Sequence, residues 1–583
     1  MVTKKFFKDI YSRVPKVALY AIDRSRVEYL FFLLMSYVIA WTGNLCGAFT
    51  DPFLSFLLPI FDFYLICIII NGLKRYKLGW LLTIPTIFLL TAEQFVVLFY
   101  HSYISLHIVQ LLAETNSKES TEFLASAITQ PSFWQTFAII VAVMAVAVML
   151  GRLSRSTFRF KQLCVFLACA LILWSGIRQL SAYKKITHCF LSSSIAECGK
   201  PQNIPHLNTP VVRTLYGLAF NVAASKELET LETSVESSEV DGCGFKCPLI
   251  LLIIGESYNK YHTPLYNQDY LPTTPRLSNL QEQGMLFAHK NAVSPFNLTS
   301  NVFKYMFSTW DEDKEDDWTA HTLFPALFRK AGYRVLFLTN QFAMESNDQW
   351  NVLGGTIFNR PKLSELQFSY RNKSTYEYDH ELLQELPPLD SLTAVPTLII
   401  IHLIGQHVRY ADRYPLEYKR FTPDEEHTLF GGEQGKVIAA DYDNATYYND
   451  AVVNDVFQQF GNTEAIGIYL SDHGEEVYDW RAQYERTSEG EISQEIARYQ
   501  YEIPLLFYLT PLFQLLHEDI THEVQTALEK PFISTDIPHL LLYLGGIQCK
   551  DYEESKNILS PHYDLHRKRI LRNQVDYDKL MRE

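Results

Sequence analysis

The sequence lacks an excess of positive charge. Its 51 lysine and arginine residues are outnumbered by 65 aspartate and glutamate residues, which gives a formal net charge of −14 at pH 7. A nucleic-acid-binding surface needs the opposite balance because it must neutralise a phosphate backbone, so the composition argues against nucleic acid as a partner. The acidity lies in the second half of the chain, which therefore needs local positive charge or a metal ion to hold a phosphate-bearing ligand.

Cysteine is also scarce, with nine residues in 583. Cys67, Cys164 and Cys169 fall in apolar segments, where they are expected to behave as small apolar residues. Cys189 and Cys198 are close enough in sequence to form a disulfide in an oxidising compartment. Cys243 and Cys247 are a second such pair, or else half of a metal site whose other half the sequence does not offer.

Internal repeats, low-complexity tracts and a cleavable signal pattern are likewise missing. The basic N-terminal arm is long and leads into a full-length apolar segment, which is unlike a cleavable signal peptide. Residues 225–242 are rich in glutamate and serine and are expected to form a solvated linker. After the apolar N-terminal region about 400 residues remain, enough for one large α/β domain.

Long apolar stretches are present, and all of them fall in the first 180 residues: 28–48, 53–72, 79–100, 134–151 and 162–180. Each is about long enough to cross a hydrocarbon core of roughly 30 Å. Buried helices of a soluble protein are the alternative, but consecutive stretches this apolar are rare there. We therefore expect a transmembrane domain of about five spans over residues 1–180. The second span is the weakest because it contains Pro59 and Asp62.

The basic residues predict how these spans are oriented. They gather in the N-terminal arm and in the connections after the second and fourth spans, whereas loops 49–52 and 101–133 contain only Lys118. Positive charge stays on the cytoplasmic side, so an odd number of spans places everything after residue 180 on the outer face. Loop 101–133 is then on the outer face as well.

Two apolar runs lead into side chains that can bind a metal ion. The run 465–470 is followed by Asp472 and His473. The run 248–254 is followed by Glu256. Open α/β sheets place their chemistry at the carboxyl ends of strands, so these three side chains, here called the ligand group, are expected at one rim. Oxygen and nitrogen ligands of this kind suit Zn²⁺, although an Asp-His pair alone fits a hydrogen-bonded loop equally well.

Short apolar strands alternate with helical stretches after residue 248. The strand candidates are 248–254, 333–339, 397–404, 465–471 and 503–509, and the helix candidates include 321–331 and 437–460. This alternation predicts a mostly parallel sheet with helices on both faces.

Several ordered segments resemble the bacterial phosphoethanolamine transferases of the alkaline phosphatase/sulfatase superfamily, in particular those that modify lipopolysaccharide core heptose. They are GES at 255–257, LTNQ at 338–341, HLIGQHVRYADRYP at 402–415, DYDNATYYNDAVV at 441–453 and SDHGEEVYD at 471–479. The resemblance implies a bridging region over 181–247 and a catalytic domain of alkaline phosphatase/sulfatase type over 248–583. It also implies a multi-pass protein of the bacterial inner membrane whose catalytic domain lies in the periplasm.

The activity implied by the resemblance is transfer of phosphoethanolamine from phosphatidylethanolamine to lipid A or lipopolysaccharide core. Relatives carry a threonine that contacts the metal and acts as nucleophile, and Thr299 stands at the matching place. Metal contact makes a hydroxyl a better nucleophile by lowering its pKa. Thr299 could instead be a helix N-cap or part of a glycosylation sequon, and Ser294 and Ser300 are neighbouring hydroxyls. The Pro-x-Arg pattern typical of active sulfatases does not follow Thr299, which disfavours sulfatase activity.

Other positions are assigned by the same resemblance. His407 is expected to bind a phosphate oxygen or assist the leaving group. His402 has a weaker case, since a histidine at the end of a buried strand is more often packed, and Asn340 lies near the site in relatives. Glu114 and Thr115 match a helix beside the donor headgroup, where a carboxylate could hold the ethanolamine ammonium. Alternatively, Glu114 faces water on an amphipathic helix.

One departure from the family is visible. Lipid A-modifying relatives place a histidine after the Asp-His-Gly motif, but the segment after Glu476 has none before His517. This favours one tightly bound metal ion and weakens the case for lipid A as acceptor. A phosphoglycerol transferase or a phosphodiesterase of the same superfamily is the alternative function. A non-catalytic membrane scaffold is disfavoured because it would not need these converging side chains.

Overall fold

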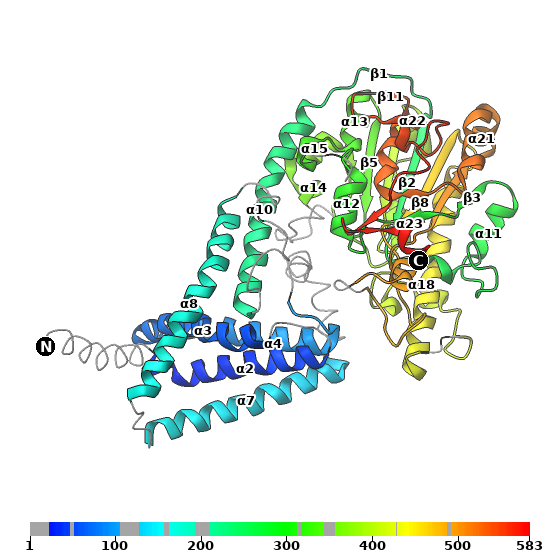
Figure 1. Ribbon diagram of the computed structural model, residues 1–583. Helices are drawn as coiled ribbons and strands as arrows, with labels where there is room; N and C mark the ends of the chain where they lie inside the picture. The colour runs from blue at the N-terminus through cyan, green and yellow to red at the C-terminus, as the bar shows by residue number, and fades with distance from the viewer. Residues whose placement is uncertain are drawn as a thin grey trace. The chain divides into compact units, whose positions relative to one another are not determined.

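The computed structural model divides the chain into two compact units, Met1–Glu227 and Leu228–Glu583 (Figure 1). The residues it describes are 22–46, 52–104, 127–156, 162–192, 198, 209–311, 314, 316–342, 356–426, 428, 430–486 and 491–582. Helix α10 (Pro210–Ser237) contains the boundary and contributes residues to both units. The expectation of a solvated linker over 225–242 is therefore wrong for most of that segment: it is helical to Ser237, and its Leu228, Leu231 and Val235 are buried in the core.

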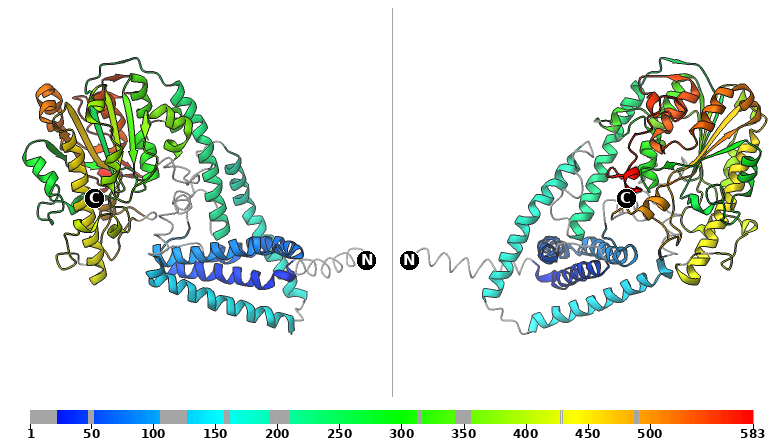
Figure 2. Two further views of the ribbon diagram at one scale, coloured as in Figure 1. Left: turned by 180° about the vertical axis from the view of Figure 1, so that it is seen from behind. Right: turned by 45° about the vertical axis from the view of Figure 1, so that its right-hand side comes forward.

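The first unit is built from long helices, which lie side by side except for the last in sequence, which crosses the others obliquely (Figures 1 and 2). They are α2 (Arg26–Leu45), α3 (Pro52–Leu73), α4 (Trp80–Tyr100), α7 (Pro131–Ser156) and α8 (Gln162–Leu191). Phe32, Met35 and Phe63 are fully buried between these helices, whereas Phe88 and Trp134 are largely exposed. Large apolar side chains on both inner and outer faces are typical of helices that lie in a membrane.

Three helical segments are long and apolar enough to cross a membrane: Phe53–Tyr76, Trp80–Tyr100 and Pro131–Arg152. The expectation of about five spans is therefore supported for three, and spanning by α2 and α8 stays a prediction. The span that looked weakest forms a continuous helix through Pro59. Its Asp62 accepts hydrogen bonds of 2.8 Å from Gln179 and Tyr183 of α8, which satisfy the carboxylate in apolar surroundings.

The cysteines differ partly from expectation. Cys189 and Cys198 form a disulfide. Cys243 and Cys247 are both free thiols, so the second predicted pairing is wrong. Strand β1 (Gly242–Cys243) holds Cys243 against β11 (Ile547–Gln548), while Cys247 is buried in the core before the next strand begins. The two side chains are thus held by different neighbours.

The second unit contains a seven-stranded sheet in the order β3-β9-β8-β2-β7-β5-β6. The strands are β2 (Leu249–Gly255), β3 (Leu286–His289), β5 (Arg334–Thr339), β6 (Tyr370–Arg371), β7 (Thr397–His402), β8 (Ala465–Ser471) and β9 (Leu505–Leu509). Neighbours from β8 to β6 are parallel, and β9 runs antiparallel to β8 and β3. The sheet is therefore mixed and mostly parallel, and the predicted strand at 503–509 is the one that runs the other way.

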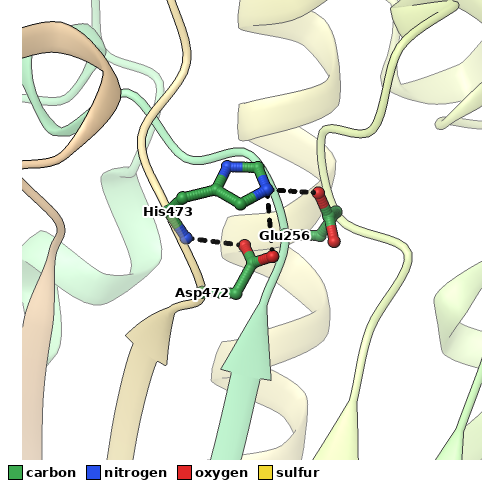
Figure 3. A group of neighbouring side chains, drawn as sticks. All are labelled: Glu256, Asp472 and His473. Carbon is green, nitrogen blue, oxygen red and sulfur yellow. Dashed lines mark hydrogen bonds and ion pairs between the residues drawn. The ribbon is translucent and has the colours of Figure 1, made fainter. Parts of the chain in front are cut away.

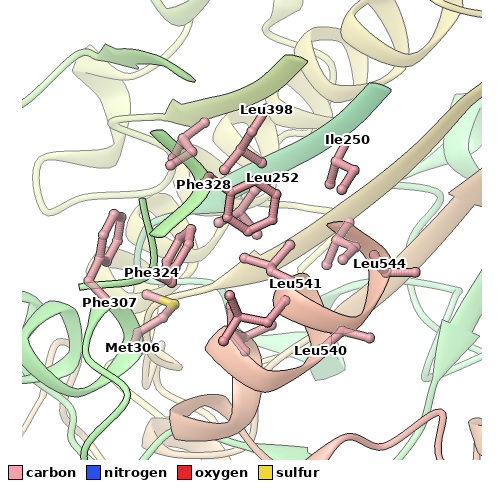
Figure 4. Packing of buried hydrophobic residues seen from close by; sticks show 14 of the residues in the cluster. Ile250, Leu252, Met306, Phe307, Phe324, Phe328, Leu398, Leu540, Leu541 and Leu544 are labelled. Atoms are coloured by element: carbon pink, nitrogen blue, oxygen red, sulfur yellow. The ribbon is translucent and has the colours of Figure 1, made fainter. Parts of the chain in front are cut away.

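Both faces of the sheet are covered, as the apolar runs predict. Along β2, Ile250 and Leu252 belong to one buried cluster, whereas Leu251 and Ile253 belong to the other, which is the period-two alternation of a strand. On the first face, side chains of α13 (Phe324–Ala331) and α22 (Ile537–Gly545) pack against the strands (Figure 4). Helices α11 (Pro275–Glu282) and α18 (Gly432–Gln459) supply the second face. Each fully buried leucine or phenylalanine contributes about 1.5–3 kcal/mol to folding stability. This core therefore holds the strands, and with them the strand ends, in place.

Candidate functional site

The ligand group lies where β2 and β8 end beside each other. Gly255, the last residue of β2, is paired with Ser471, the last residue of β8, so the following residues leave the sheet together. Glu256, Asp472 and His473 are fully buried there and point toward one another (Figure 3). The parallel pairing of two buried strands thus brings together side chains that are more than 200 positions apart in sequence.

The possible metal-binding atoms of the ligand group lie close to one another. His473 Nε2 is 3.0 Å from Asp472 Oδ2 and 3.2 Å from Glu256 Oε1. Asp472 Oδ1 accepts hydrogen bonds from the backbone N–H groups of His473 and Ser257, whereas buried Oδ2 accepts none. His473 Nδ1 is 2.9 Å from Gly474 O, and a proton on Nδ1 leaves the Nε2 lone pair directed at the carboxylates.

Thr299 lies against the ligand group. It is the first residue of α12 (Thr299–Phe307), and its Oγ1 donates a 3.0 Å hydrogen bond to Glu256 Oε2 and lies 3.3 Å from His473 Nε2. Of the neighbouring hydroxyls, Ser294 bonds to the Phe296 carbonyl. Two carboxylates, an imidazole and a hydroxyl form a donor set that suits a four-coordinate Zn²⁺, so the residues present fit this ion.

The protonation of the site follows from its burial and its charges. Burial raises the pKa of Asp472, and the adjacent Glu256 raises it further. Burial also opposes ionisation of Glu256, but His473 and nearby cations hold its pKa well below the usual value. Burial and Arg486 disfavour a charge on His473, yet the two carboxylates raise its pKa to about 9. A bound metal ion would replace that imidazolium as the counter-charge.

The predicted histidines occupy different environments. His402 ends β7, is fully buried, and packs against Phe303 with ring centroids 4.6 Å apart and the ring planes tilted by 57°. This packing is what the sequence analysis described as more common for a histidine at the end of a buried strand. His407 follows the Gly405 turn and is half-buried, with a buried Nδ1 that has no hydrogen-bond partner among the described residues. Burial lowers the pKa of His407 to about 4, although Glu256 counteracts this effect, so the ring is neutral near pH 7.

Asn340 is turned away from the ligand group. Its amide donates to Asp379 Oδ1 at 2.9 Å and accepts from Tyr376 N at 2.7 Å, so it braces a loop. The next residue, Gln341, instead donates to Glu256 Oε2 at 3.2 Å. Sequence analysis missed Gln341, although it lies in the same LTNQ segment. Glu114 and Thr115 lie outside the described residues.

Arg486 is the other side chain that sequence analysis missed. Its Nη1 is 2.7 Å from His473 Nε2, 2.8 Å from Ser257 Oγ and 3.3 Å from Glu256 Oε1. The side chain is mostly buried, with 16% of its surface exposed. The only sequence signal was indirect: the segment after Glu476 lacks histidine but contains arginine.

A buried polar network lies behind the ligand group and joins three segments. His262, from the segment after β2, is 2.7 Å from Asp443 of α18 and 3.1 Å from Asp479 of the segment after β8. Tyr270 donates to Asp443 at 2.9 Å, and Glu426 adds a further buried carboxylate nearby. Burial lowers the pKa of His262, but the two aspartates outweigh it and raise that pKa to about 10. The charged ring therefore ties together the loops that carry the ligand group.

A second acidic and histidine cluster has different chemistry. Asp311, His539 and Glu553 bring potential ligand atoms together. Lys556 pairs with both carboxylates, at 2.8 Å from Glu553 Oε2, and Arg567 pairs with Asp311 at 3.0 Å. Because cations already neutralise these carboxylates, the cluster is an ion-pair network and is poorly suited to a metal ion.

Comparison with known proteins agrees with this geometry. Residues 248–547, just over half of the chain, match the family described as Sulfatase.

This chain belongs to the sulfatase family.

Within it, the phosphoethanolamine transferase EptC of Escherichia coli K12 is 24% identical over 494 residues, which cover 80% of this chain and 79% of that protein. The crystal structure of the C-terminal periplasmic domain of Escherichia coli EptC in complex with zinc is 25% identical. It covers 59% of this chain and 96% of its own, with a TM-score of 0.50. The integral membrane lipooligosaccharide phosphoethanolamine transferase A of Neisseria meningitidis is 17% identical and covers 94% of this chain and 97% of its own, with a TM-score of 0.54. The predicted resemblance is confirmed.

Proposed function

We propose that this protein is a membrane-anchored phosphoethanolamine transferase. The observation that carries the proposal is Thr299 Oγ1 held against the ligand group, in a chain that aligns over most of its length with enzymes of that name. A hydroxyl, two carboxylates and an imidazole in one buried site provide a nucleophile and a metal site together. The relatives' names indicate the transferred group, and phosphatidylethanolamine is the proposed donor.

The first step forms a bond between Thr299 Oγ1 and the phosphorus of the donor, while the bond from phosphorus to the diacylglycerol oxygen breaks. The hydroxyl, which donates to Glu256 Oε2 in the resting site, gives up its proton to water, and the diacylglycerol oxygen takes a proton from water as it leaves, so the protons balance. Zn²⁺ bound by Glu256, Asp472, His473 and Thr299 would supply Lewis acidity that favours the ionised hydroxyl. The partial positive charge at the start of α12 favours an anion at the same place.

The second step returns Thr299 to its free form. An acceptor oxygen on envelope glycolipid, in lipid A or the lipopolysaccharide core, attacks phosphorus and breaks the bond to Thr299, whose oxygen takes a proton from water as it leaves. His407 is proposed as the group that takes the acceptor proton, because its neutral ring has a buried nitrogen without a partner. His402 and Asn340 are assigned no contact with substrate, and Glu114 and Thr115 beside the donor headgroup stay predictions.

The membrane unit would keep the site near both lipids. We propose five spans, including α2 and α8, in the bacterial inner membrane, with loop 101–133 and the catalytic domain from residue 248 onward in the periplasm. The region 181–247 would bridge the two parts. The basic segments on alternate sides of the spans support this orientation. Tethering to the donor membrane raises the effective concentration of both substrates.

Mass spectrometry of envelope lipids tests the function directly. Cells that express the wild-type chain should gain glycolipid species heavier by one phosphoethanolamine, and cells that express Thr299→Ala should not. Ser300→Ala, on the neighbouring hydroxyl, should retain the modification. Feeding labelled phosphatidylethanolamine and labelled phosphatidylglycerol separates this proposal from a phosphoglycerol transferase, since label from the wrong headgroup would refute the proposed donor.

A further inference from the structure

Arg486 lies against the ligand group. Its Nη1 contacts His473, Ser257 and Glu256, and its Nε lies 3.6 Å from Glu475 Oε2. Glu475 is itself fully buried and is held by the Tyr410 hydroxyl at 2.6 Å. The guanidinium is therefore held on one side by a fixed carboxylate and directed on the other into the ligand group.

With substrate bound, the site would contain more negative charge than a divalent metal ion can neutralise. Two carboxylate ligands, Glu256 and Asp472, cancel the charge of a divalent ion, and the ionised Thr299 hydroxyl adds a negative charge. A phosphodiester donor is itself an anion, so its approach is opposed unless another positive charge is present. A planar guanidinium with several N–H donors is well suited to phosphoryl oxygens.

Neighbouring cations are engaged elsewhere. Arg481, in the same segment, forms a two-point pair with Glu476 at 2.6 and 2.7 Å. Arg413 donates to the backbone carbonyls of His407 and Val408. Arg486, by contrast, contacts two members of the ligand group, Glu256 and His473.

We propose that the Arg486 guanidinium binds a non-bridging oxygen of the phosphoryl group during transfer, with Glu475 and Tyr410 as its positioning residues. The proposal rests on the proposed transferase function and adds to it the residue that binds the phosphoryl group. It also accounts for the missing histidine after the Asp-His-Gly motif, since an arginine of the same segment reaches the site.

Binding of inorganic phosphate tests the proposal independently of turnover. The full-length chain is purified in detergent with zinc, its zinc content is measured, and phosphate affinity is determined by calorimetry for wild type, Arg486→Gln, Arg486→Lys and Arg481→Gln. Loss of a charge-assisted bond should weaken phosphate binding in Arg486→Gln by about tenfold or more. Arg486→Lys should recover part of the affinity, because lysine keeps the positive charge but lacks the paired N–H donors of a guanidinium. Arg481→Gln, the matched control, should bind phosphate as wild type does.

Turnover provides the second measurement. Arg486→Gln should lower kcat/KM for the lipid donor by about 100-fold or more at unchanged zinc content. Wild-type phosphate affinity and turnover in a zinc-loaded Arg486→Gln variant would overturn the proposal, and so would loss of zinc in that variant, since Arg486 would then support the metal ligands. If the wild-type chain fails to transfer phosphoethanolamine, the transferase function fails, while the phosphate comparison still decides the role of Arg486.

Discussion

At the scale of single residues, the site depends on a few side chains placed by backbone geometry. Gly405 illustrates this. Its φ is +48°, and a Cβ there would lie 2.9 Å from the backbone N and O of Glu256. Even an alanine would therefore displace the segment that carries a proposed metal ligand.

The nucleophile makes the sharpest prediction at this scale. Thr299→Ala should lower transfer by about 1000-fold or more and abolish a phosphoethanolamine adduct on the peptide that contains residue 299. Zinc content should stay near the wild-type level because the ligand group is intact. Thr299→Ser should keep measurable activity, since the hydroxyl remains. Peptide mass spectrometry and a lipid-transfer assay check these outcomes. Wild-type transfer by Thr299→Ala would move the nucleophile elsewhere, with Ser300 as the next position to test.

Metal content provides a second prediction for the ligand group. The purified full-length protein should hold about one zinc ion per chain. Asp472→Ala and His473→Ala should each lower that occupancy strongly, because the remaining donors are too few for a tight site. Asp455→Ala, on the exposed surface of α18, serves as control and should leave zinc unchanged. Unchanged zinc in both ligand variants, measured by elemental analysis, would eliminate the proposed metal site.

At the scale of elements, the site depends on how α18 and two strand ends are joined. Tyr442 of α18 donates to Ser257 O at 2.8 Å and accepts from Asn259 N at 2.6 Å. One residue further along the helix, Asp443 bonds to His262. The helix thus fixes the backbone that follows Glu256, which explains why its DYDNATYY segment is polar yet largely buried.

The network around His262 predicts a pH dependence of stability. His262→Gln should cost about 3 kcal/mol, since Asp443 and Asp479 lose a buried charged partner. A raised histidine pKa stabilises the fold fully below the unfolded value of about 6.5 and progressively less up to the folded value. The difference in unfolding free energy between wild type and His262→Gln should therefore be largest below about pH 6.5. It should decline as the pH rises toward about 10.

Denaturant unfolding of the full chain in detergent at several pH values measures this difference. His517→Gln is the control, because His517 pairs near the surface with the partly exposed Glu464 and should cost less than about 1 kcal/mol. A His262→Gln penalty that stayed constant from pH 6 to pH 10 would contradict the charged ring in this network.

At the scale of the whole molecule, the proposed membrane topology predicts on which side of the membrane the catalytic domain lies. A reporter enzyme that is active only outside the cytoplasm should work when fused after residue 190 and fail when fused near residue 155. The reason is that the basic residues around 152–161 favour the inner side of the membrane. The reverse pattern would invert the topology and remove access to envelope glycolipid on the outer face.

The sequence alone determined the catalytic core because that core depends on local patterns. Short continuous apolar runs that alternate with helical stretches favour buried parallel strands, and such strands end at a common rim, so Glu256, Asp472 and His473 could be placed together from the sequence. The apolar N-terminal stretches likewise predicted the long helices, since length and hydropathy are properties of the chain itself.

Only the tertiary structure decided which loop side chains reach that rim. Arg486 contacts Glu256 across 230 positions of sequence, and no local pattern encodes such a loop path. The same holds for Gln341, which faces Glu256 while Asn340 turns to Asp379. The antiparallel direction of β9 and the free thiols at Cys243 and Cys247 also follow from neighbours that lie far away in sequence. Periodicity specifies which residues are buried, whereas packing between distant segments decides what they contact.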